Sequence, residues 1–75
     1  MKNYLSGNEI KKYRKKLQLS QVKLAAIAGV SRFNLYLYEN DLMKLSFEDI
    51  EKITIVLKKA GEKFLIDMKI GGNEL

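Results

Sequence analysis

Apolar residues recur at every third or fourth position through most of the chain, the spacing that places them on one face of a helix. This periodicity predicts an all-α fold with helices over residues 7–17, 21–28, 32–39 and 47–60. Arg14 adjoins the apolar stripe of the first helix and is expected to be half-buried. The side chains expected to form the shared core are Ile10, Tyr13, Leu17, Leu24, Ala25, Ala28, Val30, Leu35, Tyr38, Phe47, Ile50, Ile53 and Leu57.

A serine stands at the start of every expected helix: Ser6, Ser20, Ser31 and Ser46. Serine is a favoured N-cap because its hydroxyl accepts a hydrogen bond from an unpaired N–H of the first turn. Gly29 separates the second and third helices, and glycine adopts positive φ without a steric penalty, which permits a short turn there. With the small Ala25 at the expected helix contact, the stretch 20–39 has the pattern of a helix-turn-helix.

Gly61 is expected to end the fourth helix, because the apolar period changes after it. Four apolar side chains then alternate with their neighbours, which favours a strand: Phe64, Ile66, Met68 and Ile70. A single strand in a helical chain needs an outside partner, so we expect it to pair with the same strand of a second copy. A fifth amphipathic helix is the competing interpretation. The expected segments are an arm (1–6), a helix-turn-helix domain (7–60), a dimerisation segment (61–70) and a tail (71–75).

Composition narrows the classes of function. The 75 residues suffice for one domain with one small core, and they include no cysteine and no histidine. Disulfides, thiolate or imidazole metal sites and near-neutral acid-base groups are therefore not available, so we expect neither an enzyme nor a metal or cofactor. No apolar run approaches the roughly 18 to 20 residues that span a bilayer, and the N-terminus lacks an apolar signal region. A cytoplasmic location without membrane attachment is expected.

Positive charge is concentrated at one end of the chain. The net charge is +5, yet residues 1–23 contain seven Lys or Arg against Glu9 alone, a balance of +6. Residues 24–75 contain seven basic and eight acidic residues, a balance of −1. A surface that binds a polyanion requires such an asymmetry, although a solvated lysine face on a surface helix would also produce it.

These residues together resemble the lambda-repressor and Cro type of helix-turn-helix domain, also called the xenobiotic response element family. The resemblance covers residues 9–60 and rests on the series Arg14, Leu19-Ser20-Gln21, Leu24-Ala25, Gly29-Val30-Ser31, Leu35 and Tyr38-Glu39. It implies a structural ion pair between Arg14 and Glu39 that holds the third helix in place. The chain departs from the family at Phe33 and Leu37, where polar residues are common, and at Asp41, which replaces a frequent glycine.

The resemblance also implies that the third helix enters the major groove of DNA. Base contacts would then be made by Arg32, Phe33, Tyr36 and Leu37. Arg32 is suited to guanine because its guanidinium can bind O6 and N7 together, whereas Phe33 and Leu37 could contact thymine methyl groups or form a protein interface. Phosphate contacts are expected from Gln21, Ser31, Asn40, Lys11 and Lys15.

Three functional hypotheses follow. The leading one is a sequence-specific transcriptional regulator that binds double-stranded DNA as a homodimer and acts as a repressor, with an origin in a phage or other mobile element by analogy. The second is an antitoxin that binds a toxin protein and represses its own operon, because such antitoxins often end in a segment like 61–70. The third is a protein-interaction module without DNA binding. A protein partner, either a toxin or another regulator, is therefore expected only under some of these hypotheses.

Overall fold

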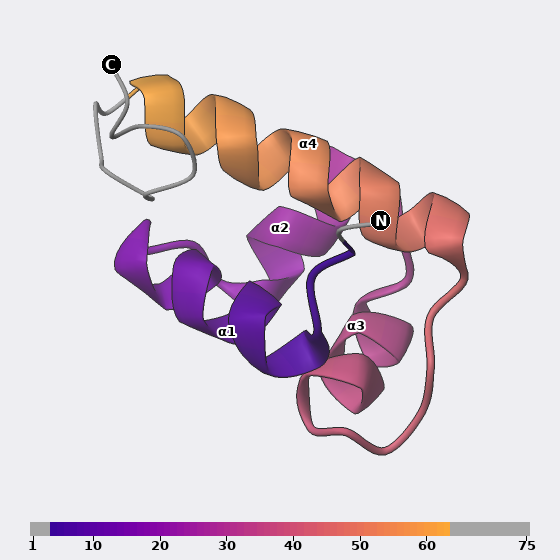
Figure 1. Ribbon diagram of the computed structural model, residues 1–75. Helices are drawn as coiled ribbons and strands as arrows, with labels where there is room; N and C mark the ends of the chain where they lie inside the picture. Colours follow the sequence, from indigo (N-terminus) through magenta and orange to yellow (C-terminus); the bar gives the residue numbers. More distant parts are fainter. Residues whose placement is uncertain (1–3, 64–75) are drawn as a thin grey trace.

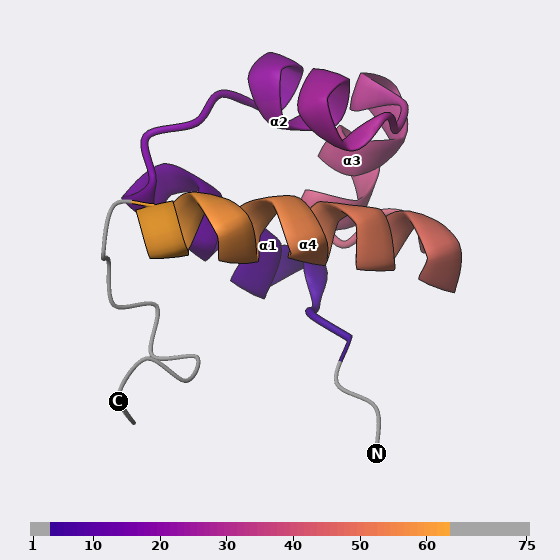
Figure 2. The same ribbon diagram turned by 90° about the horizontal axis from the view of Figure 1, so that it is seen from above.

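The computed structural model describes residues 4–63 and folds them into four helices (Figure 1). These are α1 (Gly7–Lys16), α2 (Gln21–Ala28), α3 (Arg32–Glu39) and α4 (Phe47–Lys63). Both α3 and α4 pack against α1 and α2. Figure 2 shows α4 running along the bundle, with α2 and α3 together to one side of it. The predicted four-helix all-α fold is confirmed, whereas the segment expected to form a strand, 64–70, lies outside the described residues.

Every helix begins with the same local sequence, in which an apolar residue precedes a serine and another follows four positions after it. The oxygens of Ser6, Ser20, Ser31 and Ser46 each accept the backbone N–H three residues ahead. The flanking apolar pairs are Leu5 and Ile10, Leu19 and Leu24, Val30 and Leu35, and Leu45 and Ile50. Pairs at this spacing form hydrophobic staples, and all eight side chains belong to the core or pack against it. The apolar residues that flank each capping serine therefore also anchor the start of that helix to the core.

The first three helices end in the same way, with a residue of positive φ. This residue is the C-cap itself in α2 and follows the C-cap in α1 and α3. Gln18 has φ 59°, Gly29 has φ 75° and Asp41 has φ 61°. The next residue in each case donates its N–H to a carbonyl five positions back, from Leu19 to Arg14, from Val30 to Ala25 and from Leu42 to Leu37. This bond defines the Schellman motif. Because Leu19 and Val30 also precede the next capping serine, one residue both closes a helix and opens its successor.

The core lies where the four helices meet. Its nine buried apolar side chains are Ile10, Leu17, Leu24, Ala25, Leu35, Leu45, Ile50, Ile53 and Leu57. The half-buried Tyr13, Ala28, Val30 and Tyr38 pack around them, as expected from the periodicity. Leu45 was not expected in the core, although its place one residue before the N-cap of α4 is the staple position.

Phe47 was expected in the core, and this prediction is wrong. Phe47 is 67% exposed, because it stands at the first position of α4, before the part of the helix that packs against α1 and α2. Its ring stacks on the ring of Tyr4 instead, with centroids 4.7 Å apart and planes 8° from parallel. The periodicity predicted that the buried stripe of α4 begins at Phe47, whereas it begins one turn later, at Ile50.

Gly61 was expected to end α4, and this prediction is also wrong, because α4 continues to Lys63. Gly61 has a helical conformation and is buried. A glycine inside a helix costs only about 1 kcal/mol relative to alanine, which packing against neighbouring helices can offset. The boundary expected between a domain at 7–60 and a segment at 61–70 is therefore not a helix end.

Candidate nucleic-acid interface

Three neighbouring side chains of α3 project away from the core. Phe33 is 66% exposed, Tyr36 is 44% exposed and Arg32 is exposed as well. Arg32 and Phe33 occupy the first turn of α3, directly after the N-cap Ser31, and Tyr36 lies one turn later on the same face. We call Arg32, Phe33 and Tyr36 the outer face of α3. It combines one planar cationic group with two aromatic rings, which together can donate hydrogen bonds and make apolar contacts.

Leu37 was expected on this outer face, and the structure corrects that expectation. It is half-buried near the end of α3, where the chain turns back and the N–H of Leu42 donates to the Leu37 carbonyl, 2.8 Å away. Leu37 therefore contributes at most an edge to a surface made chiefly by the three exposed side chains.

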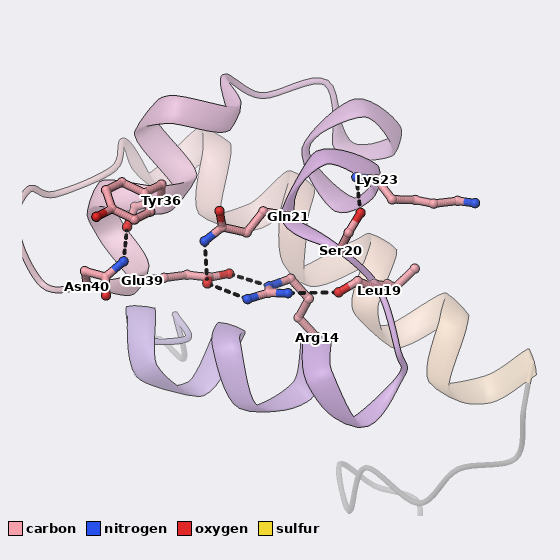
Figure 3. Close-up of polar contacts among 8 residues, drawn as sticks. All are labelled: Arg14, Leu19, Ser20, Gln21, Lys23, Tyr36, Glu39 and Asn40. Carbon is pink, nitrogen blue, oxygen red and sulfur yellow. Dashed lines mark hydrogen bonds and ion pairs between the residues drawn. The ribbon is translucent and has the colours of Figure 1, made fainter.

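A buried ion pair holds α3 against α1 (Figure 3). The Arg14 Nε and Nη2 atoms donate to the two carboxylate oxygens of Glu39 at 2.8 and 2.9 Å. The side chain of Arg14 is 10% exposed and that of Glu39 is fully buried. A bidentate pair of this kind fixes orientation as well as distance. The ion pair implied by the resemblance is thus present in the structure, and Arg14 is more deeply buried than expected.

Two further bonds extend the ion pair to α2. Arg14 Nη1 donates to the Leu19 carbonyl at 2.9 Å, in the link that leads into α2. The side-chain amide of Gln21 donates to Glu39 Oε1 at 3.0 Å, as Figure 3 shows. Gln21, the first residue of α2, is therefore bonded to Glu39, the last residue of α3, which is in turn bonded to Arg14 of α1. The sequence did not indicate the bond from Gln21 to Glu39, since Gln21 was expected only at a phosphate.

The N-termini of α2 and α3 carry no acidic side chain in their first turns, whereas α1 has Glu9 and α4 has Glu48 and Asp49 there. A helix N-terminus carries a partial positive charge. First-turn carboxylates balance that charge in α1 and α4, whereas α2 and α3 have none to balance it. An anion such as a phosphate group is favoured at such an end. Ser31 accepts the Asn34 N–H with its oxygen, and its hydroxyl hydrogen remains able to donate outward.

Asn40 is the C-cap of α3, and two of its N–H groups donate to that helix. Its side-chain Nδ2 donates to the Tyr36 carbonyl at 2.9 Å, and its backbone N–H donates to the same carbonyl at 3.1 Å. The expectation that the backbone of Asn40 faces a phosphate is therefore weakened by this geometry. The remaining amide hydrogen and the side-chain oxygen are the groups with which Asn40 can still contact a nucleic acid.

The lysines of α1 are not equivalent. Lys12, Lys15 and Lys16 are exposed, whereas Lys11 is half-buried. Lys15 and Lys16 belong to the last turn of α1, close in sequence to the link that leads to the N-terminus of α2. Of the two lysines expected at phosphates, Lys15 is thus the more accessible.

Tyr38 joins the end of α3 to the segment before α1, a contact that the sequence did not suggest. Its hydroxyl donates to the Leu5 carbonyl at 2.8 Å. Burial raises the pKa of the Tyr38 hydroxyl above its ordinary value, and the nearby carboxylates of Glu9 and Asp41 raise that pKa further. Tyr38 therefore remains a neutral donor throughout the physiological pH range.

Other classes of site find little support in residues 4–63. No group of three His, Cys, Asp or Glu side chains gathers there in a way that could hold a metal ion. None of the helices in that range is both long and apolar enough to cross a membrane.

Comparison with known proteins places this geometry in a family. A family model described as Helix-turn-helix matches residues 10–64. The "Putative HTH-type transcriptional regulatory protein" of Methanobrevibacter smithii (strain ATCC 35061 / DSM 861 / OCM 144 / PS) is 43% identical over 44 residues, which are 59% of this chain and 14% of that protein. The chain therefore corresponds to only a small part of that relative.

A solved structure, the SinR protein/SinI protein complex, contains a chain with a similar fold. The TM-score is 0.68 at 34% sequence identity, and the alignment covers 88% of this chain and 64% of that one. The matched family model begins within α1, covers α2, α3 and α4, and includes both residues of the Arg14–Glu39 pair. The chain belongs to the lambda-repressor and Cro type of helix-turn-helix family, whose members are DNA-binding domains of transcriptional regulators.

Proposed function

We propose that the chain binds double-stranded DNA sequence-specifically, places α3 in the major groove, and acts as a dimeric repressor. The observation that carries the proposal is the bonded network of Arg14, Gln21 and Glu39, which fixes α3 so that its outer face projects as one surface. The recognition helix of a helix-turn-helix protein needs such support, because base contacts depend on its orientation in the groove.

Each side chain of the outer face has a distinct role in this proposal. The guanidinium of Arg32 donates to O6 and N7 of a guanine. Phe33 and Tyr36 lie against thymine methyl groups, which favours an A·T pair beside the guanine, and Leu37 adds apolar contact at the edge of the groove. An operator with one G·C pair flanked by A·T pairs in each half-site is the expected target.

Phosphate contacts position the domain in this proposal. Gln21 and Ser31 lie at the N-termini of α2 and α3, where the absence of acidic side chains in the first turn favours an anion. Asn40 caps the C-terminus of α3 and would reach a phosphate through its remaining amide hydrogen. Lys11 and Lys15 of α1 add positive charge, and such contacts make affinity fall steeply with salt. Together they supply affinity for any DNA sequence, while α3 supplies the preference among sequences.

Selection from random duplex DNA at about physiological salt tests the proposal, since specific complexes typically reach 10⁻⁸ M or tighter. We expect a two-fold symmetric motif. Arg32→Ala should weaken binding by about 1 to 3 kcal/mol and relax the preference for guanine at one position of each half-site. Lys52→Ala, on the exposed face of α4, is the matched control and should leave affinity unchanged. Binding without an enriched sequence would contradict the proposal.

A second candidate, an antitoxin or other regulator that also binds a protein, is favoured by one observation. The similar solved structure is a complex between SinR and SinI proteins, so a related fold does pair with a second protein. In this chain the dimerisation residues of both candidates would be Phe64, Ile66, Met68 and Ile70, beyond the described part. Co-purification of a toxin encoded beside this chain, lost in a chain ending at Lys63, would favour the second candidate.

A further inference from the structure

A hollow of about 530 Å³ lies on the surface beside the end of α3, and none of the outer-face residues lines it. Its walls come from the segment before α1, the loop between α3 and α4, and the first turn of α4. The large apolar side chains that line it and are exposed are Tyr4 (42%), Leu42 (65%), Met43 (44%) and Phe47 (67%). We call these four residues the loop patch. Exposed apolar groups gathered on a small domain usually indicate an interaction surface.

The loop patch is held in shape before any partner binds. Leu42 donates its N–H to the Leu37 carbonyl at 2.8 Å, and the stacked rings of Tyr4 and Phe47 join the two sides. The Leu5 carbonyl, next to Tyr4, accepts the hydroxyl of Tyr38. A surface that is already ordered loses little conformational entropy on association.

The charges around the patch indicate what it binds. Asp41 and Lys44 are exposed and stand on either side of Leu42 and Met43, so the loop has the order acid, apolar, apolar, base. Rotation of this sequence by a two-fold axis places each acid opposite a base and each apolar pair opposite its copy. A two-fold interface needs this self-complementarity, because both partners contribute the same surface.

We propose that the loop patch pairs with the loop patch of a second copy of this chain, with Asp41 of each copy facing Lys44 of the other. The proposal rests on the proposed function in one respect, because it adds a second contact to the dimer that reads two half-sites, beside the pairing proposed for residues 64–70. The molecule measures 35 × 28 × 18 Å, and half-sites one helical turn apart are separated by about 34 to 36 Å, so two copies of this size can occupy neighbouring half-sites.

Charge exchange in the full chain tests the interface without DNA. Asp41→Lys and Lys44→Asp each place like charges opposite one another twice, and each should raise the dimer dissociation constant about tenfold or more in sedimentation equilibrium. The double variant D41K/K44D restores opposite charges and should recover the dimer. A mixture of the two single variants should form a heterodimer, because one partner then carries two bases and the other two acids.

Leu42→Ser tests the apolar part and should also weaken the dimer, whereas Ile55→Ser, at a 52% exposed position on α4, is the matched control. Thermal melting of every variant confirms that it folds. A monomeric wild-type chain, or a dimer that is equally strong in all four loop variants, overturns the proposal. Loss of DNA binding with an intact, charge-sensitive dimer would instead contradict the proposed function alone.

Discussion

Gly7, the first residue of α1, lies directly against the main chain of Tyr38 in α3. A Cβ atom built at Gly7 would overlap the Tyr38 carbonyl oxygen and carbon and approach the Glu39 α-carbon. The obstructing atoms are backbone atoms of a helix, which cannot move aside as a flexible side chain could. The close approach of α1 and α3 therefore depends on the absence of a side chain at residue 7.

Gly7→Ala should destabilise the fold, although alanine is the better helix former. Overpacking of this kind costs typically 1 to 3 kcal/mol, and we expect a value at the upper end because backbone must shift. Gly29→Ala is an informative comparison, since nothing lies within 4 Å of its added methyl group and only its φ of 75° resists the change. It should cost less than Gly7→Ala in urea unfolding. The reverse order would show that α1 and α3 are not in close contact.

The Arg14–Glu39 pair should behave as a unit. Arg14→Met leaves the fully buried carboxylate of Glu39 without its main partner, and the free energy of unfolding should fall by about 3 to 5 kcal/mol. Arg14→Met combined with Glu39→Leu removes both charges, and its loss should be clearly smaller than that of Arg14→Met alone. Denaturant unfolding of the four proteins in the cycle measures this coupling. Simple additivity of the two losses would exclude a coupled pair.

Because the pKa of Tyr38 is raised in the folded protein, we expect the free energy of unfolding to decline in alkaline solution. Its folded pKa lies above the ordinary value of 10.0, so between the two values the unfolded chain has lost the proton that the folded chain keeps. The contribution is complete below about pH 10 and is lost as the pH rises through the folded pKa. Ionisation also removes the hydrogen donated to Leu5.

Tyr38→Phe provides the control for this pH dependence. It should lower stability near pH 7 by about 1 kcal/mol, the usual net worth of one hydrogen bond. The stability difference between wild type and variant should shrink above pH 10, because only the wild type loses the Tyr38 contribution. A difference that stays constant from pH 7 to pH 11 would contradict the assignment. Comparing the two proteins cancels the titration of the lysines that they share.

Lys15 should contribute to the salt dependence of the affinity for DNA. If it contacts one phosphate, Lys15→Gln should make the negative slope of log affinity against log salt less steep by about 0.9, with little change in the preferred sequence. Lys52→Gln on α4 removes the same charge elsewhere and should leave the slope nearly unchanged. Equal effects of both variants would indicate a response to net charge and no contact at Lys15.

The parts of the fold that the sequence predicted are those fixed by local chemistry. The four serine caps, the turn at Gly29 and the bounds of α2 and α3 agree with the structure, because capping and positive φ depend on a few adjacent residues. The Arg14–Glu39 pair came from the family resemblance and not from the pattern, since residues 25 positions apart have no local signal.

The sequence-based predictions were wrong or incomplete where contacts between helices determine burial or conformation. Periodicity assigned Phe47 to the core and Gly61 to a helix end, although the packing of α4 leaves the first exposed and buries the second. Gln18 adopts φ 59° without being glycine, because the short link from α1 to α2 requires that conformation. The contact between Gly7 and the main chain of Tyr38 likewise depends on how two helices cross. The expected DNA contacts remain predictions, although the structure supports an exposed Arg32, Phe33 and Tyr36.

The residues that close one helix and open the next have a dynamic consequence. Leu19 ends α1 with its N–H and stands before the cap of α2, and Val30 does the same between α2 and α3. In each connection the residue of positive φ and the residue after it donate their N–H groups to the preceding helix, so fraying of one helix removes part of the support of its neighbour. Segments linked in this way open as a single cooperative unit. Amide hydrogens inside α3 should therefore exchange with solvent only when α1 and α2 unfold as well, and the outer face of α3 retains its orientation for as long as the domain is folded.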